Sequence, residues 1–149
     1  ASSGTPFNFT FNSTIIGGNS NYDATSTDVI YYVFKNVEGY SKFGTYIGNG
    51  SADGAFVYTG FRPAFLLMKR TDATGYWGLW DTVRDVDNPV IYELSPNEPD
   101  AETTAAGDRL DILSNGFKLR HDGVAYNASG SPIIYMAFAE APFKYANGR

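Results

Sequence analysis

The residue types that carry acid–base or nucleophilic chemistry are sparse in this chain. It contains one histidine, His121, and no cysteine, so neither a thiolate nucleophile nor a thiolate metal site can form. Acyl transfer by a serine needs a base and a residue that orients that base. His121 precedes Asp122 and Gly123, where an exposed hairpin turn is expected. We therefore assign no catalytic residue and predict that the protein is not an enzyme.

Carboxylates offer the remaining route to catalysis. A glycosidase needs two of them about 5 to 9 Å apart on one sheet face, whereas the acidic residues here gather in predicted loops between residues 81 and 102. Asp85, Asp87 and Asn88 offer hard oxygen ligands for calcium, but Pro89 breaks the ligand pattern of an EF-hand loop. A glycoside hydrolase therefore ranks below the non-enzymatic alternatives, and we predict neither a metal site nor a cofactor.

Flat aromatic side chains beside polar groups are typical of carbohydrate binding. If residues 76–80 form a strand, alternation places Tyr76 and Trp80 on one face and directs Trp77 to the other face, toward the core. Four strand steps separate Tyr76 from Trp80 by about 13 Å, so these two residues could form a glycan platform. A carbohydrate-binding, lectin-like module that recognises a cell-surface glycan is therefore the main alternative function.

Four Asn-x-Ser/Thr sequons occur, at Asn8, Asn12, Asn49 and Asn127. These asparagines are candidate glycosylation sites in a compartment that has the machinery. Asn49 and Asn127 lie in predicted turns, where the hydrogen bonding of an asparagine side chain explains its presence without a sugar.

The elements that position these residues are predicted to be strands. Aromatic residues make up 16% of the chain and accompany 16 glycines and 7 prolines, a composition typical of β-sandwiches and barrels. About ten short apolar runs alternate with turn dipeptides such as Asn-Gly and Asp-Gly. The chain is therefore expected to be all-β, a two-sheet antiparallel β-sandwich of the jelly-roll or lectin-like kind. The predicted strands include residues 29–34, 45–47, 56–58, 65–70, 110–113, 117–120, 124–126 and 133–138.

Charge and hydropathy exclude two classes of partner. The formal net charge is −5, and the longest basic run is the pair Lys69-Arg70, so nucleic acid is not an expected partner. No apolar stretch approaches the roughly 20 residues that a membrane span needs. Residues 93–109 are acidic and rich in proline, which predicts a long surface loop.

The N-terminal strand has the strictest pattern in the chain. Phe7, Phe9 and Phe11 alternate with polar residues, and two isoleucines follow. We expect residues 1–20 to form a separate strand or arm and residues 21–149 to form the sandwich domain. The predicted subunit-interface residues are Phe7, Phe9, Phe11, Ile15 and Ile16.

Two docking sites are open to this strand. Its phenylalanines contribute about 2 kcal/mol each wherever they become buried. If they fill their own sandwich, nothing further follows. If the groove belongs to the next subunit, the strand joins copies head to tail by strand addition, and a repeating contact that does not close produces a filament.

An internal similarity bears on this choice. Residues 24–34 match residues 128–138 in pattern and in several identities, at a constant offset along the chain. Either the sandwich contains two similar central strands, or the chain opens with the closing strands of one repeat and continues through a complete second repeat. In the second case the opening segment is free to complete the sheet of another copy.

Two local motifs have a structural interpretation. Gly60, Phe61 and Pro63 predict a bend with a buried ring at the corner of a sheet. Asp81 and Arg84, three residues apart, are expected to pair or to cap the loop that follows them.

Several motifs also occur in a fixed order along residues 24–145. They are a Gly-Asn-Gly turn at residues 48–50, a Thr-Gly-Phe-x-Pro corner at residues 59–63, an apolar strand ending in Lys69, an aromatic strand followed by Asp81 and Arg84, a Ser-Asn-Gly-Phe hairpin at residues 114–117 and an Asn-Ala-Ser-Gly turn at residues 127–130. In these motifs the chain resembles a repeat module in tail-fibre-type structural proteins of marine and other tailed phages. The resemblance implies a β-rich virion module, often arranged in tandem, with no catalytic residues to carry over.

We therefore predict a non-enzymatic structural subunit of an extracellular or virion assembly. Its partners would be copies of itself in a homo-oligomer or filament, and its location would be extracellular or on the virion surface. Carbohydrate binding is the competing function, and hydrolysis is the third.

Overall fold

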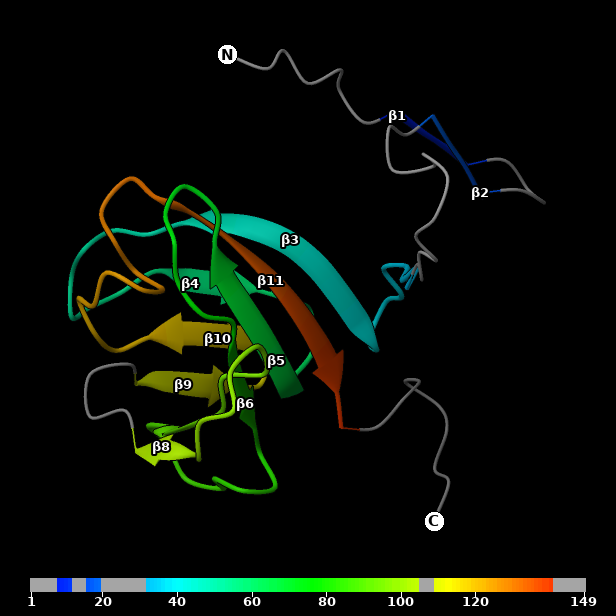
Figure 1. Cartoon of the computed structure of the whole chain (residues 1–149). Coiled ribbons are helices and arrows are strands. Elements are labelled where there is room, and N and C mark those ends of the chain that lie inside the picture. Colours follow the sequence, from blue (N-terminus) through cyan, green and yellow to red (C-terminus); the bar gives the residue numbers. More distant parts are fainter. Residues whose placement is uncertain (1–7, 12–15, 20–31, 105–108, 141–149) are drawn as a thin grey trace. The chain divides into compact units, whose positions relative to one another are not determined.

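A computed structural model describes residues 8–11, 16–19, 32–104 and 109–140. The chain divides into two compact units, residues 1–34 and residues 35–149, and the predicted arm at residues 1–20 falls within the first (Figure 1). Every pair of strands in the described residues is antiparallel. The predicted all-β, antiparallel fold is therefore confirmed.

The described part of the first unit is a hairpin of β1 (Asn8–Phe11) and β2 (Ile16–Asn19). Its register sets Phe9 opposite Gly18 and Phe11 opposite Ile16. Because residues opposite each other lie on one face of an antiparallel pair, these four positions share a face. The other face carries positions 8, 10, 17 and 19, which are polar residues or glycine. The hairpin is thus amphipathic in sequence.

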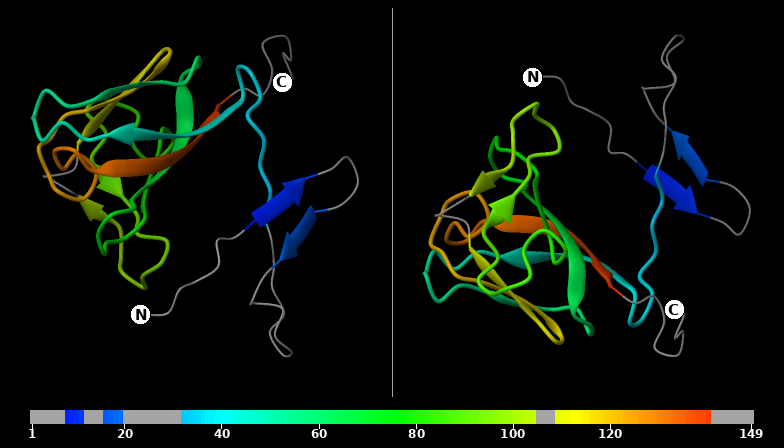
Figure 2. Two further views of the ribbon diagram at one scale, coloured as in Figure 1. Left: turned by 90° about the horizontal axis from the view of Figure 1, so that it is seen from above. Right: turned by 90° about the horizontal axis from the view of Figure 1, so that it is seen from below.

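The second unit contains two main sheets and a short strand pair. The four-stranded sheet has the order β3 (Ser41–Ile47), β11 (Pro132–Ala139), β5 (Pro63–Arg70), β6 (Gly78–Asp81), and Figure 2 shows β3 and β11 side by side in two further views. The three-stranded sheet has the order β4 (Phe56–Tyr58), β10 (Gly116–Leu119), β9 (Leu110–Leu113). A two-stranded sheet joins β7 (Tyr92–Glu93) to β8 (Thr103–Thr104).

The hydrophobic core draws on both main sheets, as expected of a β-sandwich-like fold. The Phe117 ring, from the three-stranded sheet, lies edge to face with Tyr46 and Tyr135 of the four-stranded sheet, at centroid distances of 5.9 and 5.5 Å. Such aromatic pairs add a directional term to the burial of apolar area. The fully buried apolar side chains include Leu66, Met68, Leu110, Phe117, Leu119, Ile133 and Ala137.

The chain passes from one sheet to the other through the predicted corner at residues 59–63. Gly60 has a φ of 87°, which L side chains rarely adopt. Phe61 is buried, and the Thr59 hydroxyl donates a 2.6 Å hydrogen bond to the Phe61 carbonyl. Pro63 then begins β5. The sheet-corner interpretation of this motif is therefore confirmed.

Two predicted strands differ from the structure. Residues 32–34 form no strand, and Tyr32, Val33 and Phe34 are 79%, 55% and 51% exposed, while residues 29–31 lie outside the described part. Residues 124–126 form a turn, because the Asn127 N–H bonds back to the Gly123 carbonyl at 3.1 Å. An apolar run predicts a strand from local pattern alone, and neither run has a neighbouring strand to pair with in the described residues.

The predicted acidic loop at residues 93–109 is partly structured. Its first residue ends β7, and Thr103 and Thr104 form β8 opposite Glu93 and Tyr92. Residues 105–108 lie outside the described part. The turn between these strands holds the prolines, whereas the strands themselves are free of them.

We predict that Phe117→Ala lowers the free energy of unfolding by about 3–5 kcal/mol, because it removes a fully buried ring from between the sheets. The matched control is Phe56→Ala, whose ring is 48% exposed and should cost less than about 1.5 kcal/mol. Urea denaturation measures both. Equal losses for the two variants would contradict the placement of the core.

Candidate functional site

The outer face of the four-stranded sheet, which points away from the three-stranded sheet, carries an apolar patch, and the charged side chains of Lys69 and Asp81 lie at its borders. The strand register places Phe43, Met136, Leu67 and Leu79 in one row across the four strands. The same register places Phe138 beside Phe65 in the adjacent row. All six of these side chains are half-buried. Large exposed apolar patches mark interaction surfaces in soluble proteins, so this face is the first candidate site.

Aromatic contacts hold one end of the outer face rigid. The Phe138 ring centroid lies 5.6 Å from that of Phe43 and 5.8 Å from that of Phe65, both in edge-to-face geometry. Tyr40 adds a third contact to Phe138 at 5.8 Å. A partner would therefore meet a preformed aromatic surface and would lose little side-chain entropy on the protein's side of the contact.

A groove lies farther along the same face, with a volume of about 450 Å³. Gly44 lines this groove, and on the inner side of the sheet a Cβ atom at Gly44 would lie only 2.9 Å from the Tyr135 ring. Burial raises the pKa of Tyr135, which keeps its phenol neutral. Trp77 is held at the groove by its backbone N–H, which donates a 2.8 Å hydrogen bond to Asn97 Oδ1. The groove is lined by Phe43, Gly44, Thr45, Trp77, Ile134, Tyr135 and Met136.

The corresponding face of the three-stranded sheet has a different character. Lys118 forms an ion pair with Asp53 at 2.6 Å, and Arg120 forms one with Asp111 at 2.5 Å. The hydrogen bond from Lys118 lowers the pKa of Asp53 below its ordinary value. The exposed rings of Phe56 and Tyr58 lie on this same face, so it mixes ion pairs with aromatic side chains.

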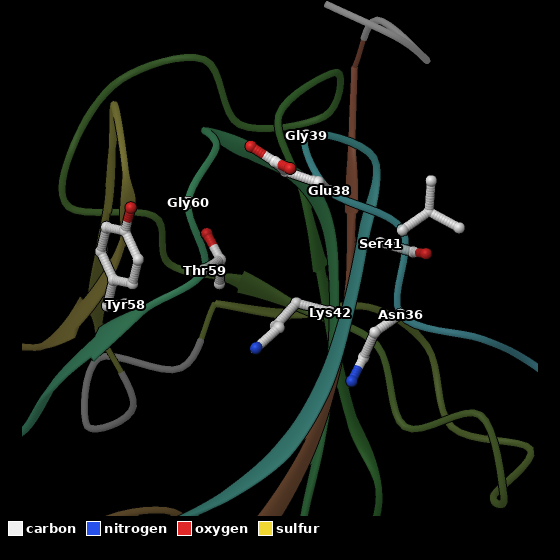
Figure 3. Close-up of a pocket in the computed structure, with 9 residues that line it drawn as sticks. Asn36, Glu38, Gly39, Ser41, Lys42, Tyr58, Thr59 and Gly60 are labelled. Carbon is white, nitrogen blue, oxygen red and sulfur yellow. The ribbon is translucent and has the colours of Figure 1, made fainter.

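A second cavity of about 300 Å³ is polar and lies between the start of β3 and the end of β4. Figure 3 shows Lys42 extending from β3 toward Tyr58 and Thr59, with Asn36 on the same side as Lys42. Asn36 Oδ1 accepts a 2.7 Å hydrogen bond from the Phe43 N–H, so the Asn36 amide is fixed in position. The Tyr58 ring is 64% exposed. The cavity thus combines a cation, an amide and an exposed aromatic ring.

The predicted glycan platform of Tyr76 and Trp80 is wrong. Trp80 is 1% exposed, and its ring centroid lies 5.0 Å from that of Tyr126 inside the core. Tyr76 is exposed but precedes β6, which begins at Gly78. Trp77, which was expected in the core, lines the outer groove instead. Gly78 is the signal for this arrangement, because a Cβ atom there would come within 2.3 Å of the Trp80 ring.

The predicted sequons fall into different environments. Asn127 is fully buried, and its Nδ2 lies within hydrogen-bond distance of Asn49 Oδ1, the Ser51 carbonyl and the His121 carbonyl, at 3.0, 2.9 and 2.7 Å. The prediction that Asn127 can accept a glycan is therefore wrong for the folded protein. Asn49 is exposed. Asn8 lies in β1, and Asn12 lies outside the described residues.

The predicted subunit-interface residues are only partly described. Phe9 and Phe11 lie in β1, and Ile16 begins β2, where the backbone register places them on one face. Phe7 and Ile15 lie outside the described residues.

His121 is buried rather than exposed as expected. It is 5% exposed, and its Nδ1 accepts a 3.0 Å hydrogen bond from the Gly123 N–H. The turn closes over the imidazole instead of presenting it to solvent.

The buried carboxylate of Glu93 accepts a 2.6 Å hydrogen bond from the Tyr126 hydroxyl. Sequence reasoning missed Glu93, because a lone acidic residue beside a proline-rich segment carries no signal of burial.

The predicted pair of Asp81 and Arg84 is confirmed. Arg84 Nε lies 2.5 Å from Asp81 Oδ2, and Asp81 Oδ1 accepts the backbone N–H groups of Val83 and Arg84. Burial acts to raise the pKa of Asp81, but these hydrogen bonds outweigh it and hold the pKa below its ordinary value. Arg84 also pairs with Glu102, so the three residues tie the turn after β6 to the acidic segment.

Across residues 8–11, 16–19, 32–104 and 109–140, no group of three or more histidine, aspartate or glutamate side chains is placed to hold a metal ion. No helix in these ranges is long and apolar enough to cross a membrane.

Fold and surface together define a β-sandwich-like domain with an apolar patch on the outer face of its four-stranded sheet. The chain belongs to a family described as a domain of unknown function (DUF7483), whose model matches residues 2–142. No curated protein and no solved structure matches the chain.

We predict that Asn127→Asp lowers the free energy of unfolding by about 2–4 kcal/mol, because a carboxylate oxygen would then face the oxygens that Nδ2 now contacts. Asn49→Asp is the matched control. Asn49 is exposed and keeps its acceptor oxygen, so the loss should stay below about 1 kcal/mol. Thermal or urea unfolding of both variants checks the expectation, and a reversed order would refute it.

Proposed function

We propose that the protein is a non-enzymatic structural subunit of an extracellular or virion assembly, in which copies join head to tail by addition of the N-terminal strand. The sandwich supplies the body of each subunit, and the first unit supplies the connection to the next. The assembly is a homo-oligomer or filament of this chain.

The observation that carries the proposal is the division of the chain into two unequal units. The first contains a two-stranded hairpin, and such a hairpin is marginally stable in water unless it packs against something else. Among the residues that the structure describes, the buried core side chains lie between Tyr46 and Ala137, within the sandwich itself. The hairpin is marginally stable unless it packs against another surface, whereas the described core of the sandwich is formed by its own residues. This combination favours docking of the hairpin on a neighbouring copy.

The outer face of the four-stranded sheet supports the same function. It is preformed and apolar, and its aromatic side chains are of the type enriched at protein interfaces. The resemblance of the chain to tail-fibre-type modules of tailed phages also favours an assembly role and a location outside the cell or on a virion.

Deletion of residues 1–20 tests the proposal. The shortened chain should keep the free energy of unfolding of the sandwich within about 1 kcal/mol, because its core residues lie downstream. It should nevertheless no longer associate with other copies of the chain. Sedimentation velocity and negative-stain microscopy compare it with the full chain. An unchanged assembly state after the deletion would mean that the N-terminal strands do not join copies.

Carbohydrate binding is the second candidate, and it now rests on the polar cavity rather than on the predicted platform. Tyr58 offers an exposed ring, and Lys42 and Asn36 offer polar groups beside it (Figure 3). An aromatic face flanked by hydrogen-bonding groups fits a sugar ring. In a repeating assembly each subunit would present one such cavity, so many weak sugar-binding sites would act together and raise the overall affinity.

Tyr58→Ala should reduce binding to any glycan that a glycan array identifies, by about tenfold for the loss of one aromatic contact. Tyr76→Ala is the matched control, because Tyr76 is similarly exposed but does not line the cavity. An array without a bound glycan, or equal losses in the two variants, would remove this second function.

A further inference from the structure

We propose that the acceptor for the N-terminal strand is the outer edge of β3 at residues 44–48, and that the strand it accepts is β1 of a neighbouring copy. This inference rests on the proposed function and names the contact that performs it.

The backbone of β3 bonds to β11 through its even-numbered residues. The Gly48 N–H donates to the Ser131 carbonyl, and the Gly48 carbonyl accepts from the Gly130 N–H, both at 2.9 Å. At the other end the Ala139 N–H donates to the Tyr40 carbonyl at 2.8 Å. Since bonded positions alternate in an antiparallel pair, the odd-numbered residues of β3 direct their N–H and C=O groups away from the sheet.

Local groups occupy the first part of this edge and leave the second part open. Ser41 exchanges hydrogen bonds with Val37, and the Phe43 N–H donates to Asn36 Oδ1. Beyond that point, no described residue bonds the outward groups of Thr45 or Ile47. Both residues are exposed, Ile47 by 57%. An exposed edge with unpaired backbone groups is a template for another strand.

The alternation of side chains on β3 matches the alternation on β1. Phe43, Thr45 and Ile47 belong to the apolar outer face, whereas Lys42 and Gly44 point to the other side. If positions 9 and 11 of β1 lie on the outer face, their phenylalanines extend the apolar surface of the sheet. The polar positions 8 and 10 then lie on the side of Lys42 and the polar cavity.

A neighbouring copy, rather than the same chain, is the donor in this proposal, because the described core residues come from the sandwich itself and a strand from the first unit is not needed to complete that core. Among the described strands β1 pairs with β2 alone, so its other edge is open to a strand in this proposal. The joined sheet would have the order β2-β1-β3-β11-β5-β6.

Thr45→Pro tests the acceptor in the full chain. Proline removes the outward N–H of Thr45 but none of the N–H groups that bond to β11, which is the placement that edge strands tolerate. Association between copies should weaken about tenfold or more, because one partner carbonyl loses its donor. Thr45→Val, which keeps the N–H and the β-branched shape, should associate as the unaltered chain does. Sedimentation velocity measures association, and circular dichroism checks that both variants fold.

Hydrogen exchange tests the same contact without any substitution. In the assembled full chain, the amides of Thr45 and Ile47 should exchange about tenfold more slowly than in dilute monomer. Copies that associate while these amides exchange at an unchanged rate would overturn this acceptor and leave the proposed function standing. Protection that is independent of concentration would place the donor in the same chain and overturn the neighbouring copy. Absence of association at any concentration would instead defeat the proposed function itself.

Discussion

The structure depends on the packing of β11, a central strand that is apolar on both faces. Ile133, Tyr135 and Ala137 are buried on the inner side of the four-stranded sheet, and Ile134 and Met136 lie on the outer side. A strand of this kind needs cover on both faces, as strands in the middle of layered folds have. The three-stranded sheet covers the inner face and supplies the core. The outer face is not covered by the three-stranded sheet.

This requirement explains why the two outer faces differ so strongly. The three-stranded sheet carries Lys118 and Asp111 outward, in ion pairs that keep this face hydrated. One face of this sheet is exposed to solvent, as is common for antiparallel sheets. The four-stranded sheet instead presents phenylalanine and aliphatic side chains that contact each other across strands. Such a surface is consistent with the proposed assembly of copies.

The sequence predicted the fold class and the corner at residues 59–63 because strand patterns and turn residues are local properties. It also predicted the pair of Asp81 and Arg84, which are only three residues apart. It failed for Trp80 and His121, because their burial depends on contacts distant in the sequence or on the way a turn closes. The burial of Asn127 and its several hydrogen-bond partners were not predicted for the same reason, since its partner Asn49 lies 78 residues away in the sequence. Periodicity assigns a face to a residue only after the strand boundaries are known.

The self-contained core has a consequence for how copies would join. When a donated strand supplies missing core residues, folding and association are one event, and the complex is held by the whole stability of the domain. Here the described core residues lie within the sandwich, so in the proposed assembly the sandwich would fold before copies associate. The contact is then held only by edge hydrogen bonds and by the apolar positions of one hairpin. Because residues 43–47 of β3 carry no charge, such a contact is governed by burial and backbone pairing rather than by ion pairs, and salt screening has little to act on.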